Sequence, residues 1–150
     1  MLECPGVFTM PFVPEGWTVT SEDGHSFFEL QPPGRDAAVH ISVYRRRIPT
    51  PLADGDVEAH LMKFVRLRPT EGSPTVVVVP PEPDEHRAFA KYLNRNDDGR
   101  LTAWFAACIL WPSAMLICSC NAAPGHPALK DGEIMIASIF QGTEEPPATG

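Results

Sequence analysis

An uncharged stretch at residues 103–120 restricts the possible folds of this chain more than any other feature. It reaches the length, about 18 residues, at which a transmembrane helix has to be considered. However, Pro112 and Ser113 interrupt the stretch in its middle, and its aromatic, cysteine and β-branched side chains suit strands. We therefore expect a buried β-hairpin, with strands over 101–111 and 114–121, rather than a membrane span.

Proline, at 17 of 150 residues, divides the rest of the chain into short segments. We expect strands over 7–13, 17–20, 25–30, 37–45, 75–79 and 87–95, a helix over 57–68 and a closing helix over 128–140. Strands and helices do not alternate regularly in this order. The sequence thus predicts an α+β fold, in which a largely antiparallel sheet is flanked by two main helices.

The ends of both helices can be predicted from capping residues. Asp54 or Asp56 can accept hydrogen bonds from the free amides at the start of the helix over 57–68. Pro69 cannot continue that helix and should end it. Gly142 is expected to end the closing helix.

The size and composition of the chain are those of one folded domain. Hydrophobic residues make up 43% and charged residues 21% of the sequence, which excludes the composition of a disordered protein. We predict a single domain over 1–142 and a flexible tail over 143–150. The formal net charge of -7 disfavours a general binder of nucleic acid or of an anionic membrane.

The amino terminus carries neither a basic region nor an apolar segment typical of a secretory signal, so the cytoplasm is the predicted location. The four cysteines should then be reduced thiols. No Cys-x-x-Cys pair occurs among them, and we expect small buried side chains rather than a metal site at Cys4, Cys108, Cys118 and Cys120.

Motifs of established catalytic chemistry do not occur in the sequence. It has no Gly-x-Ser-x-Gly, no His-Glu-x-x-His and no phosphate-binding loop, and its five histidines lie on separate segments. Residues 94–99 resemble the first half of a calcium loop, but Phe105 stands where a bidentate Glu is needed, which favours a plain hairpin turn. We therefore expect no catalytic residue, metal or cofactor.

Two groups of residues are candidates for binding a partner protein. Arg45, Arg46 and Arg47 form the one concentrated basic run, which either holds an acidic group or is a solvated strand end that discourages aggregation. The second group is the crowded apolar hairpin, with Trp104, Trp111 and Met115. These side chains form either an ordinary core or, if a sheet face is incompletely covered, a docking patch for a helix, a second subunit or an apolar peptide.

The layout of the chain resembles the PsbP-like family of small α/β/α sandwiches. The similarity rests on an apolar strand leading into Pro-Glu-Gly-Trp at 14–17, the strand over 38–44, the helix near 57–67, the Asp-Gly turn at 98–99 and Ala-Ser-Ile at 137–139. The family includes DcrB-like lipoproteins, Mog-type Ran-binding proteins and Eag-type secretion chaperones. The resemblance implies a non-catalytic binding or assembly module with no catalytic residues to transfer.

Our leading hypothesis is a non-enzymatic cytoplasmic, bacterial protein-binding module. One version is an Eag-like chaperone for the hydrophobic segment of a secreted toxin, which should expose an apolar groove and form a homodimer. The other is an immunity protein that neutralises a basic toxin site through an acidic surface. That surface would comprise Glu82, Asp84, Glu85, Asp97 and Asp98.

A small hydrolase or ligand-binding enzyme with a dispersed site is the alternative from a different class. Its site would be assembled from residues far apart in the sequence, namely His40, Tyr44, Cys118 and Asp98. Such an enzyme requires a concave pocket in which a histidine meets a cysteine or a carboxylate within hydrogen-bond reach.

Overall fold

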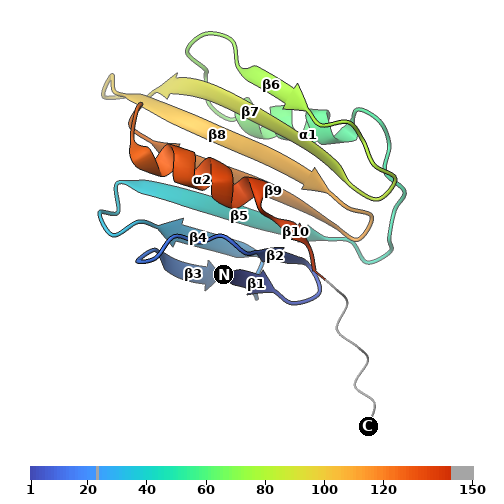
Figure 1. Ribbon diagram of the computed structural model, residues 1–150. Coiled ribbons are helices and arrows are strands. Elements are labelled where there is room, and N and C mark those ends of the chain that lie inside the picture. The colour runs from blue at the N-terminus through green and yellow to red at the C-terminus, as the bar shows by residue number, and fades with distance from the viewer. Residues whose placement is uncertain (23, 143–150) are drawn as a thin grey trace.

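A seven-stranded antiparallel sheet with the strand order β3-β4-β5-β9-β8-β7-β6 runs through the molecule (Figure 1). The computed structural model describes residues 1–22 and 24–142, and the predicted tail over 143–150 lies outside them. The strands of this sheet are β3 (Thr18–Glu22), β4 (Phe27–Gln31), β5 (Ala37–Arg45), β6 (Thr75–Val78), β7 (His86–Arg95), β8 (Leu101–Leu110) and β9 (Ala114–Ala122). The uncharged stretch forms most of β8 and β9, as predicted.

Helices cover the two faces of this sheet. α1 (Asp56–Val65) packs against β7 and β8 on one face, and α2 (Pro127–Ala137) packs mainly against β9, β8 and β5 on the other face (Figure 1). The central strand β8 is therefore covered on both sides, which accounts for its apolar side chains in both directions. The predicted α+β fold, a mostly antiparallel sheet with two flanking helices, is confirmed. Within the described residues, no helix has the length and apolar character needed to cross a membrane.

A small second sheet lies on the α2 side of the molecule. It consists of β1 (Leu2–Cys4), β2 (Phe8–Met10) and β10 (Phe140–Gln141), in the order β1-β2-β10. The ring of Phe8 meets Phe28 of β4 edge to face, with centroids 5.5 Å apart. This sheet therefore completes the core over the β4 and β5 end of the large sheet.

The predicted ends of α1 were wrong. Neither aspartate caps the helix; Gly55 occupies the N-cap with a φ of 88°, a backbone conformation that glycine adopts at little cost. The helix also ends at Val65, before Pro69, because the amide of Leu67 bonds to the carbonyl of Phe64 and tightens the last turn.

The end of α2 and the first strand also differ from the prediction. α2 stops at Ala137 instead of Gly142, because the chain turns and Phe140 pairs with Thr9 of β2. The amide of Gly142 then bonds to the carbonyl of Val7 at 2.9 Å. The predicted strand over 7–13 shortens to β2, and β1 and β10 form where no strand was predicted.

Candidate functional site

Each helix covers only part of its face of the large sheet, which leaves open areas on opposite faces (Figure 1). Because α2 lies over β5, β9 and β8, the strands β7 and β6 are open beside it. Because α1 lies over β7 and β8, the strands β3, β4 and β5 are open on the other face. Incomplete cover of an apolar sheet face is the condition under which a docking patch was expected.

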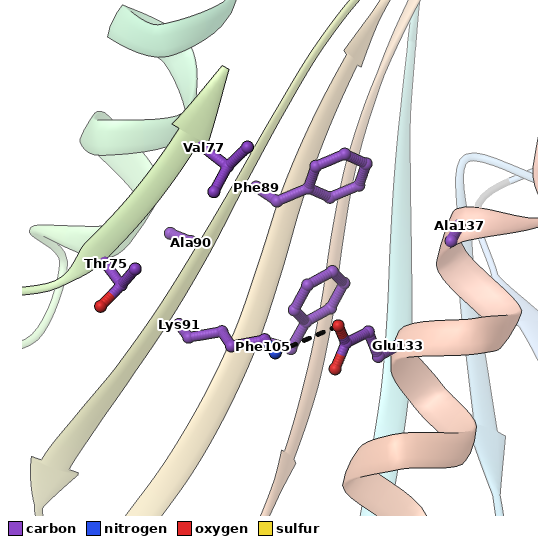
Figure 2. Close-up of a pocket in the computed structure, with 8 residues that line it drawn as sticks. All are labelled: Thr75, Val77, Phe89, Ala90, Lys91, Phe105, Glu133 and Ala137. Atoms are coloured by element: carbon purple, nitrogen blue, oxygen red, sulfur yellow. Dashed lines mark ion pairs between the residues drawn. The ribbon is translucent and has the colours of Figure 1, made fainter. Parts of the chain in front are cut away.

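A trough runs along the open area beside α2, and we call it the α2 trough (Figure 2). It consists of two adjoining cavities of about 330 and 780 Å³, which share Thr75, Lys91, Phe105 and Glu133. β6 and α2 form its walls, and β7 and β8 form its floor. Its apolar lining comprises Val77, Phe89, Leu93, Ala103, Phe105, Leu129 and Ala137.

The floor of the α2 trough follows from the alternation of side chains along β7. Ala88 and Tyr92 are buried under α1, so Phe89 and Lys91 project from the opposite face into the trough. Phe89 stacks on Phe105 of β8, with ring centroids 5.7 Å apart and an interplanar angle of 21°. Two aromatic rings therefore form an apolar surface at the bottom of the trough.

The walls of the α2 trough also present apolar side chains to solvent. Val77 of β6 is 56% exposed, and Ala137 at the end of α2 is exposed as well. β6 is an edge strand of four residues without a charged side chain or a proline. Its short length limits pairing with another chain, but the strand carries no charge or proline of its own that would prevent such pairing.

One ion pair crosses the α2 trough. Lys91 Nζ lies 3.1 Å from Glu133 Oε1, with the two side chains 59% and 41% exposed (Figure 2). An exposed pair of this kind contributes little to stability. Its effect here is electrostatic, because the two charges cancel at the middle of the trough and leave it without a net charge of either sign.

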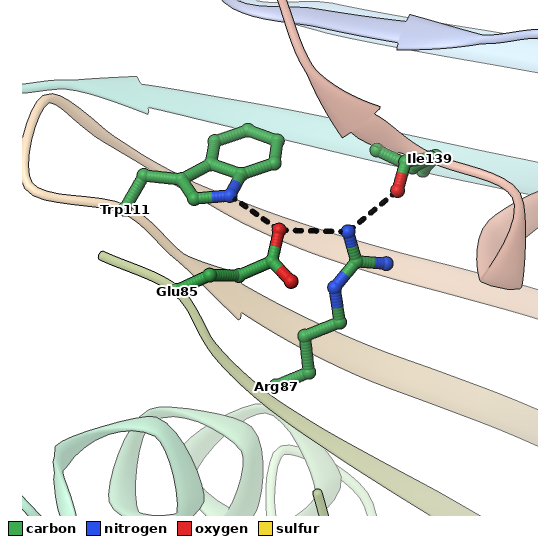
Figure 3. Close-up of polar contacts among 4 residues, drawn as sticks. All are labelled: Glu85, Arg87, Trp111 and Ile139. Carbon is green, nitrogen blue, oxygen red and sulfur yellow. Dashed lines mark hydrogen bonds and ion pairs between the residues drawn. The ribbon is translucent and has the colours of Figure 1, made fainter. Parts of the chain in front are cut away.

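A partly buried polar network lies beside the trough and fixes the segment after α2 to the sheet (Figure 3). Glu85 accepts hydrogen bonds from Trp111 Nε1 and Arg87 Nη2, both at 2.9 Å, and Arg87 Nη2 also donates to the carbonyl of Ile139 at 2.6 Å. Burial raises the pKa of Glu85, but the hydrogen bonds from Arg87 and Trp111 and the charge of Arg87 outweigh it and hold the pKa below its usual value. Glu85 is thus a charged structural group.

The structure buries both tryptophans of the apolar hairpin, as in the ordinary core that was one of the two alternatives for these side chains. Trp111 is fully buried in the network above, and Trp104 is 8% exposed. Trp104 Nε1 donates to Asn94 Oδ1 at 2.7 Å, its ring stacks on Tyr92, and the guanidinium of Arg68 lies 4.7 Å from the ring centroid. Asn94, the first position of the calcium-like loop, is therefore already engaged by Trp104.

The basic run lies at the end of β5, and its first two arginines make different contacts. Arg45 turns toward the small sheet, where its Nη2 atom lies 3.5 Å from Cys4 Sγ and 3.5 Å from the carbonyl oxygen of His25. The amide of Arg46 bonds to Ser113, beside the turn between β8 and β9. Met115, which pairs with Tyr44 of β5, lies on the α1 face and not in the trough.

The acidic residues of the immunity hypothesis lie at the two ends of β7. Glu82, Asp84 and Glu85 precede this strand, whereas Asp97 and Asp98 follow it. A ten-residue strand extends about 30 Å, so the two groups do not share one surface. Glu85 is in addition held by Arg87 and Trp111.

The residues of the hydrolase hypothesis are also separated. His40 and Tyr44 point to the α1 face of β5, whereas Cys118 is buried on the α2 face and Asp98 bonds to the amide of Arg100. His40 contacts a different carboxylate, Glu29 Oε2, at 2.7 Å. Within the part of the chain that the structure describes, no group of three His, Cys, Asp or Glu side chains is placed to hold a metal ion.

The comparisons with known proteins show the fold alone. No protein-family model and no curated protein matches the chain. Among solved structures, the chain is similar to a protein from Bacteroides thetaiotaomicron VPI-5482, with a TM-score of 0.63 and 20% sequence identity. The similarity covers 94% of this chain and 47% of that protein, so the chain spans about half the length of the structure that it matches.

Proposed function

We propose that the protein is a non-enzymatic protein-binding module and that the α2 trough holds an apolar helix of a partner protein. The observation that carries this proposal is the apolar floor of the trough, where the partly buried ring of Phe89 stacks on the buried Phe105 beside the exposed Val77. A groove of this kind is the usual receptor for the apolar face of an amphipathic helix. The neutralised pair Lys91 and Glu133 favours a segment that carries no strong charge.

The dimensions of the sheet fit a helix beside α2. Neighbouring strands lie about 4.8 Å apart, and packed helices lie about 8–10 Å apart. α2 is centred near β9, so a second helix in contact with it would lie two strands away, over β7. That position is the floor of the α2 trough.

This geometry favours an Eag-like chaperone over an immunity protein, because the acidic residues of the latter are split between the ends of β7. The arrangement of one helix on each face of an antiparallel sheet supports the PsbP-like resemblance. The four cysteines are free thiols, which supports a reducing compartment such as the cytoplasm.

The test is the binding of a labelled helical peptide of about 15 residues, with leucine and alanine on one face and glutamine on the other. We expect it to bind, and a scrambled peptide without an apolar face to bind at least tenfold more weakly. Val77→Lys should lower the affinity about tenfold, because it places a charge at the apolar wall. Fluorescence anisotropy measures the dissociation constant of each peptide and each variant.

Val78→Lys is the matched control. Val78 neighbours Val77 on β6 and is 46% exposed, but its side chain points to the opposite face of the sheet. Its substitution should leave peptide binding unchanged. Equal losses for Val77→Lys and Val78→Lys, or no binding by the wild type, would contradict the proposal. A light-scattering mass that shows a dimer, dissociated by Val77→Lys alone, would assign the trough to a second copy of the chain.

A further inference from the structure

A second groove lies on the other face of the large sheet, between α1 and the ends of β5 and β9, and we call it the α1 groove. It has a volume of about 300 Å³. Its lining consists of Tyr44, His60, Lys63, Phe64, Leu67, Met115 and Ile117. None of these residues carries a negative charge, which distinguishes this groove in a chain whose net charge is -7.

The α1 groove combines a half-buried apolar floor with exposed apolar margins. Met115 and Phe64 lie partly buried at its floor. Leu67, just beyond the end of α1, is 69% exposed, and Tyr44 of β5 is 53% exposed. Large apolar side chains exposed on both sides of a cavity are typical of a site that receives an anchoring side chain from a partner.

Four basic residues lie in this groove or follow its lining residues closely along the chain. Lys63 lines the groove, and Arg66, the C-cap of α1, lines a neighbouring cavity together with Lys63 and Asp56. Arg46 and Arg47 leave β5 two and three residues after Tyr44. None of these four forms an ion pair within residues 1–22 and 24–142. In contrast, a carboxylate lies within 3.6 Å of Arg87, Lys91 and Arg95 of β7 and of Arg100 in the turn that follows β7.

We propose that the α1 groove binds an acidic segment of a partner protein that inserts one aromatic or aliphatic side chain between Tyr44, Leu67 and Met115. The carboxylates of that segment pair with Lys63 and with the arginines at the end of β5. Charge complementarity selects the acidic partner, since the unpaired cations attract it from solution, and the apolar cavity supplies the anchor. This surface lies on the opposite face from the α2 trough, so the two sites are tested separately.

The probe for this site is a labelled peptide with one phenylalanine and one leucine among aspartates and glutamates. We expect it to bind, to weaken as the salt concentration rises, and to lose affinity when serine replaces its two apolar residues. A peptide with lysine in place of the acidic residues should not bind. Fluorescence anisotropy with the full chain measures all of these constants.

Two pairs of surface variants separate the groove from general electrostatics. Lys63→Glu should weaken binding of the acidic peptide about tenfold. Lys130→Glu, the same charge change at an exposed residue of α2 that lines the α2 trough on the opposite face, should alter it less than twofold. Leu67→Ser should weaken binding about fivefold, and Ile134→Ser, at a 43% exposed residue of α2, should not. Val77→Lys in the α2 trough should leave the acidic peptide bound.

The proposal is overturned by any of three results. The first is that the acidic peptide does not bind. The second is that Lys130→Glu weakens binding as much as Lys63→Glu, which would reduce the effect to net charge. The third is that a single-stranded oligonucleotide binds as tightly as the peptide and that its affinity is unchanged by Leu67→Ser. This result would indicate a surface that binds polyanions in general.

Discussion

Gly132 of α2 lies directly against Cys120 of β9. A Cβ atom placed on Gly132 would stand 2.7 Å from the Cys120 Cβ, overlap its Sγ and lie 3.2 Å from a methyl group of Val39. These neighbours belong to the sheet, so they cannot move aside as a flexible side chain on the surface would. The depth at which α2 sits on the sheet, and hence the wall of the α2 trough, depends on this glycine.

Gly132→Ala is therefore expected to destabilise the protein. In an ordinary helix interior the same change stabilises by about 1 kcal/mol, because alanine is the better helix former. Here overpacking against Cys120 should reverse the sign and cost about 1–3 kcal/mol of unfolding free energy. Urea denaturation measures it, with Lys130→Ala on the exposed side of α2 as a control that should stay within about 0.5 kcal/mol. An increase in stability of Gly132→Ala would disprove the close contact.

The network around Glu85 predicts a specific dependence of stability on pH. The folded pKa of Glu85 lies below its usual value of 4.5, so its carboxylate stabilises the folded state above that pH, and the contribution is lost as the pH falls through the folded pKa. Glu85→Gln should lower the free energy of unfolding by about 1–2 kcal/mol at pH 7, because the acceptor of the hydrogen bond from Arg87 is then neutral. The difference in unfolding free energy between the variant and the wild type should become smaller toward pH 3.

Urea titrations of both proteins from pH 7 to pH 3 check this dependence. The pKa of Asp36 is lowered by its hydrogen bond with His126. Asp36 is present in both proteins, so its contribution to the pH dependence cancels when their unfolding free energies are subtracted. A difference in unfolding free energy that stays constant from pH 7 to pH 3 would mean that the charge of Glu85 does not stabilise the fold.

The sheet core was predictable because its signals are local. The strand over 37–45 was predicted with its observed bounds, since Val39, Ile41 and Val43 alternate with polar side chains and all three are buried. The hairpin of β8 and β9 was located to within one residue because Pro112 and Ser113 mark its turn. Burial on both faces of β8 follows from its uninterrupted apolar side chains.

The remaining features depend on contacts between distant parts of the chain. β10 has two residues and forms only because Phe140 reaches Thr9, which no local pattern indicates. The α2 trough depends on which strands α2 leaves open, so Phe89 and Val77 could not be assigned to it in advance. The small alanines that alternate with Phe89 in β7 were the available signal that this strand has one narrow and one open face.

The buried thiols should be unreactive in the folded protein. Burial raises the pKa of Cys108 and of Cys120 to about 12, and it also raises the pKa of Cys118 and of Cys4. Because the thiolate is the reactive form, a disulfide reagent at pH 8 should label no thiol rapidly in the native state and four in urea. A Val78→Cys variant, with its thiol at an exposed position, should add one rapid equivalent. Rapid labelling of the wild type would contradict the burial of its cysteines.

The hydrogen bond between Trp104 and Asn94 should be worth more than an exposed bond of the same type. Both residues are buried, so Asn94→Leu leaves the Trp104 N–H without a partner and should cost about 1–3 kcal/mol. Trp104→Phe leaves the Asn94 amide unpaired instead, and the double variant should cost less than the sum of the two. Urea denaturation of the four proteins gives this coupling energy. The control is Asn96→Ala, which removes an exposed 3.3 Å hydrogen bond with Thr102 and should lower the unfolding free energy by less than about 0.5 kcal/mol. Additive effects of Asn94→Leu and Trp104→Phe would refute the coupling.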